Sequence, residues 1–187
     1  RNRDKFSTFD VVSQLGWIGE DFLLPDRVIR LAKEENPVPI QYIGRVPEDA
    51  YRAKGTVGGW SETMRLLAGV PGAHAVRFMI YAAFTSAVLE PLGLRPFIIH
   101  LHGDTSEGKT TALRVAASIY GRPDFGGAMI RWNDTETFIV RYCEQLHNVP
   151  LIIDELSGET KKNFDALVYQ LEGGISKGKA DRHDPNA

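Results

Sequence analysis

The spacing of apolar and polar residues predicts a mixture of helices and strands along the chain. The longest apolar run covers residues 78–89. Its 12 residues are too few to span a bilayer, but they suit a helix in a protein core. We therefore expect a helix over residues 73–90, which ends where a proline and a glycine follow. A shorter helix is predicted over residues 61–67, with Ser61 as its N-cap.

Residues 1–57 predict a small β-rich segment. Two apolar runs flank residues 19–21, whose sequence Gly-Glu-Asp is typical of a hairpin turn. Residues 38–44 predict another strand, which Pro39 would confine to a sheet edge because proline cannot donate a backbone hydrogen bond. Trp17 could stack on nucleic-acid bases, but a place in the core is the stronger interpretation.

From residue 97 onward, strand-like and helical spacings alternate. Residues 97–102 predict a buried strand and residues 111–120 a helix. Residues 129–132 predict a second strand, residues 135–146 a helix with one apolar stripe, and residues 149–154 a third strand. Strands that alternate with helices in this way are typical of an α/β fold with a parallel sheet.

Composition adds few constraints to this picture. The chain of 187 residues is 43% hydrophobic and 25% charged, values that argue against disorder and against a coiled coil. Its net charge of −2 gives no overall attraction to nucleic acid, so any such contact needs a local basic patch. The single cysteine, Cys143, excludes an internal disulfide, suits the reducing cytoplasm, and is expected to pack in the core. The chain starts at Arg1 without a signal peptide and is expected to be a fragment of a longer cytoplasmic protein.

One loop carries recognisable chemistry. Residues 103–110 match G-x-x-x-x-G-K-[ST], the phosphate-binding loop of P-loop nucleotidases, and they lie between a predicted strand and a predicted helix, as the motif requires. Backbone N–H groups of such a loop point at phosphate oxygens, and the start of the helix adds its positive end. We therefore expect ATP or GTP to bind here, although a chance glycine-rich turn is the alternative. The residues predicted to bind nucleotide are Gly103, Asp104, Thr105, Ser106, Glu107, Gly108, Lys109, Thr110 and Thr111.

A second motif follows at the end of the third strand. Asp154 is predicted to hold Mg²⁺ together with the Thr110 hydroxyl, since this cation prefers oxygen ligands. Glu155 is predicted to act as the general base that activates a water, with Lys109 stabilising charge on the phosphates. The alternative is a strand that ends in two solvated acids. The phosphate-binding loop upstream makes hydrolysis of ATP the favoured interpretation.

The order of these elements favours one branch of the P-loop proteins. A strand–helix unit between the two motif strands is typical of RecA-like and AAA+-like (ASCE) enzymes, in which a later strand lies between the motif strands. Nucleotide kinases place the motif strands side by side. The chain reaches Ala187 before such a later strand could occur. Truncation, another strand order, or another segment in that place would each explain this.

Residues 173–183 provide the best nucleic-acid candidate. Lys177, Lys179 and Arg182 lie among glycines there and could contact phosphates. Arg182 could instead enter the active site of a neighbouring subunit as an arginine finger, which would make it catalytic. A solvated loop is the alternative to both roles.

Several segments together resemble one known family. These segments are Gly16-Trp17, Phe22, Leu24-Pro25-Asp26, Gly55-Thr56 with Trp60, residues 101–113, residues 153–156 and residues 173–182. They are similar to the domain of unknown function 927 family, helicase- and primase-like P-loop ATPases of bacteria, phages and mobile elements. The resemblance implies an ATPase that acts on or near DNA. Some members are inactivated derivatives, but Lys109, Thr110, Asp154 and Glu155 are all present here.

The combined expectation is an α/β P-loop NTPase core over residues 58–187, incomplete at its C-terminus, after a β-rich segment over residues 1–57. It would use ATP and Mg²⁺, bind single-stranded or duplex DNA, form a homo-oligomeric ring in the full-length protein, and have no membrane partner. The favoured function is a helicase-like, DNA-dependent motor. The alternative is a nucleotide-dependent switch or assembly scaffold without unwinding activity.

Overall fold

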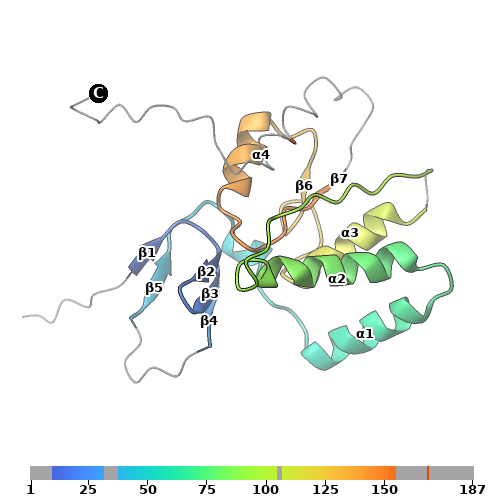
Figure 1. The fold of residues 1–187 in the computed structure, drawn as a ribbon, viewed down its shortest axis with the longest axis horizontal. Helices are drawn as coiled ribbons and strands as arrows, with labels where there is room; N and C mark the ends of the chain where they lie inside the picture. Colours follow the sequence, from blue (N-terminus) through green and yellow to red (C-terminus); the bar gives the residue numbers. More distant parts are fainter. Residues whose placement is uncertain (1–9, 32–37, 105–106, 155–167, 169–187) are drawn as a thin grey trace, which may run out of the picture.

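A computed structural model of the chain describes residues 10–31, 38–104, 107–154 and 168. The described residues form small sheets and four α-helices, a mixed α/β arrangement (Figure 1). None of the described helices is both long enough and apolar enough to cross a lipid bilayer.

The N-terminal part contains a three-stranded antiparallel sheet of β2 (Gly16–Ile18), β3 (Asp21–Leu24) and β4 (Arg27–Arg30). β2 and β3 pair across the predicted turn, so the hairpin is confirmed. Trp17 lies edge-on to Phe22, with 5.1 Å between the ring centroids, and its indole N–H donates to the Ala87 carbonyl at 2.7 Å. The core role of this tryptophan is therefore also confirmed.

A separate two-stranded sheet joins β1 (Asp10–Val12) to β5 (Ile40–Tyr42) in parallel. The strand predicted over residues 38–44 is shorter than expected. It has one described neighbour and thus lies at a sheet edge, as Pro39 predicts. A short 3₁₀ turn, η1 (Glu48–Ala50), follows.

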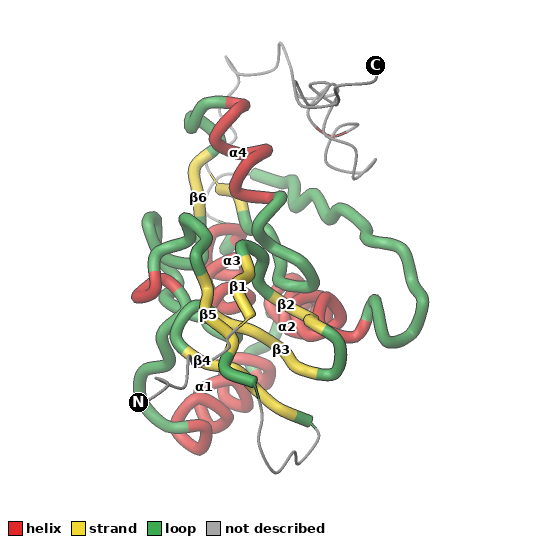
Figure 2. The backbone as a smooth tube through the Cα atoms, turned by 90° about the vertical axis from the view of Figure 1, so that its left-hand side faces the viewer, coloured by secondary structure: helices red, strands yellow, loops and turns green. Residues whose placement is uncertain are grey.

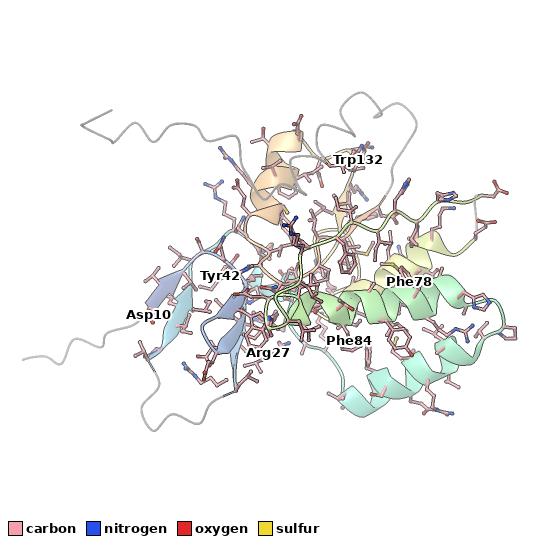
Figure 3. The ribbon with its side chains drawn as sticks, in the orientation of Figure 1. Asp10, Arg27, Tyr42, Phe78, Phe84 and Trp132 are labelled. Carbon is pink, nitrogen blue, oxygen red and sulfur yellow. The ribbon has the colours of Figure 1, made fainter. Side chains whose placement is uncertain are left out.

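Two helices then form an antiparallel pair, α1 (Val57–Gly69) and α2 (His74–Val88) (Figure 1). The α2 bounds confirm the helix expected over residues 73–90. The predicted start of α1 is wrong, because Thr56 accepts the Gly59 N–H at 3.1 Å and caps the helix five residues earlier than Ser61 would. Phe84 projects from α2 toward α1 and meets Trp60 edge-on, with 6.1 Å between ring centroids (Figure 3).

The following helices are α3 (Lys109–Ala117) and α4 (Glu136–Cys143). α4 connects β6 (Ile130–Arg131) to β7 (Ile153–Asp154), and these two strands pair in parallel. This confirms the predicted strand–helix–strand unit.

The prediction of a buried strand over residues 97–102 is wrong. The described chain assigns no strand there, and Phe97 and Ile98 are 51% and 50% exposed. Ile99 and Leu101 alone in this stretch pack against the core. A strand needs hydrogen-bonded neighbours, and β7, the other motif strand, has only β6 beside it among the described strands. In Figure 1 the segment runs as an irregular path toward the start of α3.

One buried cluster joins the N-terminal part to α2, α3 and α4. It includes Leu15 before β2, Phe22 from β3, Met79 from α2, Ala116 from α3 and Ile139 from α4. Viewed from the side, the N-terminal strands lie in front of α2 and α3, and α4 lies above them (Figure 2). The core therefore draws on residues from both sides of the boundary expected near residue 57.

Candidate functional site

The glycine-rich loop ends in a backbone conformation that favours glycine. Gly108 is the N-cap of α3 and has φ 79° and ψ 13°, in the left-handed region, while Gly103 at the other end has φ 149°. A side chain at either position would be strained. The Gly108 carbonyl accepts the Ala112 N–H at 2.9 Å and thereby closes the first turn of the helix. The two glycines thus shape the turn from the extended segment into α3.

The Lys109 side chain folds back over this loop. Its ammonium donates to the Gly103 carbonyl at 2.9 Å and also to the Asp104 carbonyl. The structure therefore brings Gly103, Asp104, Gly108 and Lys109 together, as the motif predicts. A lysine ammonium has three donors and no acceptor, so an anion in the loop could replace either carbonyl as its partner.

The start of α3 leaves its first-turn amides without a side-chain cap. Gly108 has no side chain to offer, and no capping hydrogen bond is formed there. Amides at a helix start that lack an internal partner, together with the helix dipole, attract anions such as phosphate. Lys109 is half-buried, whereas Thr110 and Thr111 are exposed at the same end.

Helix α3, which follows the loop, is held in place by its packing against other helices. Ala112, Ala116 and Ala117 are buried, and α3 packs along α2. The Trp60 indole N–H donates to the Ser118 hydroxyl at 3.0 Å, which connects α1 to the end of α3. The Tyr120 hydroxyl donates to the Ala83 carbonyl of α2 at 3.0 Å. Sequence reasoning missed both bonds, since each joins residues that lie far apart in the chain; the only available signal was that a half-buried indole N–H needs an acceptor.

Asp154 lies at the C-terminal end of β7, opposite Arg131 in the parallel register. Its backbone carbonyl accepts the Trp132 N–H at 2.9 Å. The donor set of one carboxylate and the Thr110 hydroxyl fits Mg²⁺, which usually keeps several waters and takes its other ligands from substrate phosphates. Among the described residues there is no group of three or more His, Cys, Asp or Glu side chains that could hold a metal without such a substrate.

The two motifs do not share a sheet in the described part of the chain. β7 pairs with β6, and residues 97–102 before the loop are not in that sheet. No strand lies between the two motif segments in any sheet among the residues that the structure describes. Six predicted site residues lie outside the described residues: Thr105, Ser106, Glu155, Lys177, Lys179 and Arg182.

Cys143 is partly buried. Burial raises the pKa of this thiol, and the neighbouring Glu144 carboxylate raises it further. Because the thiolate is the reactive form, Cys143 is a poor nucleophile here.

The family model described as Domain of unknown function (DUF927) matches residues 3–185. The chain belongs to this family. The DUF927 match includes the N-terminal strands, the glycine-rich loop and Asp154, so the family region contains both predicted motifs. No curated protein matches the chain in sequence.

Proposed function

We propose that this chain binds ATP with Mg²⁺ at residues 103–111 and hydrolyses it as a RecA- or AAA+-like P-loop NTPase. The observation that carries the proposal is the loop itself. The Lys109 ammonium lies against the loop carbonyls, and the uncapped start of α3 faces the same loop. Both groups supply positive charge where a triphosphate needs it.

The parallel β6–α4–β7 unit supports the RecA-like branch over nucleotide kinases. In that branch the strand of the second motif has a strand–helix unit directly before it. Asp154 ends β7 and thus stands where a carboxylate could reach a metal beyond the sheet edge.

Each site residue would have one task. Glu155 orients a water and accepts its proton as that water attacks the γ-phosphate. Lys109 and the loop amides neutralise charge on the β- and γ-phosphates. Asp154 and Thr110 hold the metal, and Mg²⁺, when bound, offsets charge on the same phosphate oxygens.

Calorimetric titration of the 187-residue chain with ATP and Mg²⁺ tests the site. Lys109→Ala should weaken ATP binding roughly 10- to 150-fold or more, because charge-assisted hydrogen bonds are lost. Lys54→Ala is the matched control. Lys54 is exposed and lies outside the loop, and its substitution removes the same positive charge. Unchanged ATP affinity in a folded Lys109→Ala variant would remove the loop from the proposal.

We further propose that ATP hydrolysis drives a helicase-like motor on single-stranded or duplex DNA, assembled as a ring in the full-length protein. In that ring Arg182 would complete a neighbouring active site, or would contact DNA together with Lys177 and Lys179. The second candidate is a nucleotide-dependent switch or scaffold, which the near-neutral net charge of −2 favours.

ATPase activity of the full-length protein with and without single-stranded DNA separates these two functions. Stimulation by DNA supports the motor, and its absence at low salt supports the switch. The 187-residue chain alone should turn over ATP slowly, because an arginine finger from a neighbour is worth about 10³–10⁵ in rate.

A further inference from the structure

A pocket of about 670 Å³ lies beside β6 and shares no lining residue with the glycine-rich loop. Its walls come from three parts of the chain that are distant in sequence. They are residues 45–47 after β5, residues 125–131 up to and including β6, and residues 134–145 around α4. Both residues of β6, Ile130 and Arg131, line the pocket. The volume falls within the usual range for small-ligand sites.

The pocket concentrates positive charge. Arg45, Arg131 and Arg141 line it, and Asp134 is the one carboxylate among the described residues of its lining. Asp134 is already engaged, because its Oδ2 accepts the Arg131 backbone N–H at 3.0 Å. No ion pair between described residues uses the guanidinium of Arg45 or Arg141, and both residues are exposed. A chain with net charge −2 thus carries a local site for anions.

Aromatic rings line the same pocket. The Arg131 guanidinium carbon lies 4.3 Å from the Phe125 ring centroid, a cation–π arrangement that orients this arginine. Phe138 is 45% exposed, although it sits on α4 beside the core. Its ring lies 5.6 Å from that of Tyr142, at an interplanar angle of 34°. Phe138 therefore offers a flat apolar surface next to the arginines.

We propose that this pocket binds single-stranded nucleic acid, with Arg45 and Arg141 on phosphates and a base against Phe138. Arginines beside an exposed aromatic ring match a strand whose phosphates and bases are both accessible. A duplex hides its base faces, and an acidic peptide has no need of a stacking surface. The proposal rests on the DNA partner of the proposed function, but it does not depend on ATP.

Fluorescence anisotropy with a labelled oligothymidylate, the 187-residue chain and no ATP tests this site. Phe138→Ala should weaken binding about 5- to 150-fold, the range for loss of one stacked base. Arg45→Ala with Arg141→Ala should lower the slope of log affinity against log salt by about 1.4, because two phosphate contacts are lost. The matched control is Arg52→Ala with Arg65→Ala, two exposed arginines that are paired with acids elsewhere on the surface.

Equal loss of affinity in the pocket and control variants would overturn the proposal, as would full binding by Phe138→Ala. A mononucleotide that displaces the oligothymidylate as effectively as an unlabelled strand would overturn it in favour of a free-nucleotide site. Lys109→Ala should leave oligothymidylate binding unchanged. Loss of ATP binding with intact strand binding, or the reverse, therefore tells whether the loop or the pocket is wrongly assigned.

Discussion

Helices α3 and α4 both follow a strand-like segment, but they begin in different ways. Thr135 caps α4 and accepts the Phe138 N–H at 3.2 Å, and the preceding β6 is paired with β7. α3 begins at Gly108 without a side-chain cap, after a segment that is not in a sheet. The start of α4 is satisfied within the chain. The start of α3 has no such side-chain cap among the described residues.

The two helix starts also differ in how much they contribute to stability. A threonine cap is typically worth about 1 kcal/mol, and α3 has no equivalent. Its stability comes instead from packing, since its buried alanines lie along α2. Packing along α2 therefore holds α3 in place although its first turn has no side-chain cap.

The largest expected effect concerns turnover. Glu155→Gln in the full-length protein should reduce ATP hydrolysis about 10²- to 10⁴-fold, because a general base is lost, and should leave ATP affinity unchanged. Phosphate release and calorimetric titration measure the two quantities. Glu136→Gln, which changes the same group in the first turn of α4, is the control. Equal turnover in the Glu155→Gln and parent proteins would remove Glu155 from the mechanism.

A smaller effect is expected at the tip of α3. Gly108→Ala should reduce ATP affinity roughly 10- to 150-fold if one charge-assisted hydrogen bond is lost. It should also lower the free energy of unfolding by about 1–2 kcal/mol, because alanine is strained at φ 79°. Gly58→Ala in α1 is the control, since a Cβ there meets nothing within 4 Å. Calorimetric titration and urea unfolding should distinguish Gly108→Ala from Gly58→Ala. If both variants have the same ATP affinity and the same free energy of unfolding, the loop conformation affects neither quantity.

Thr135→Ala tests the capped start of α4. Loss of the α4 cap should lower the free energy of unfolding by about 1 kcal/mol, while ATP affinity stays the same. Urea unfolding and calorimetric titration provide the two measurements. A large loss of ATP affinity would show that α4, and not only α3, contributes to the nucleotide site.

The smallest effect is expected at the base of α3. Ser118→Ala removes the acceptor of the Trp60 indole and should lower the free energy of unfolding by about 0.5–1.5 kcal/mol. Trp60→Phe should cost more, and the double variant should cost less than the sum of the two changes. Simple additivity in urea unfolding would mean that the bond contributes nothing.

Local patterns in the sequence predicted the local elements well. The apolar run predicted α2, the glycine turn predicted the β2–β3 hairpin, and the apolar stripe over residues 135–146 predicted α4, which is shorter than expected. α1 was misplaced because Thr56 and Ser61 are both good caps, and only the folded chain decides between them.

Features that need distant partners escaped prediction. Residues 97–102 have the composition of a strand, but a strand also requires neighbours, and the described residues supply none. The glycine-rich loop was found because its residues are consecutive. The arginine pocket was not, since Arg45 and Arg141 come from segments about a hundred residues apart and neither segment carries a motif.

Two backbone hydrogen bonds of Leu15 constrain the order in which the chain folds. The Leu15 N–H donates to the Gln145 carbonyl at 2.8 Å, and the Leu15 carbonyl accepts the His147 N–H at 3.0 Å. During translation, Leu15 leaves the ribosome long before either partner exists. Such non-local contacts slow folding and leave apolar surface exposed in the meantime. Leu15 and Phe22 are buried in the folded protein. In a nascent chain both side chains therefore stay exposed to solvent until residue 147 has emerged.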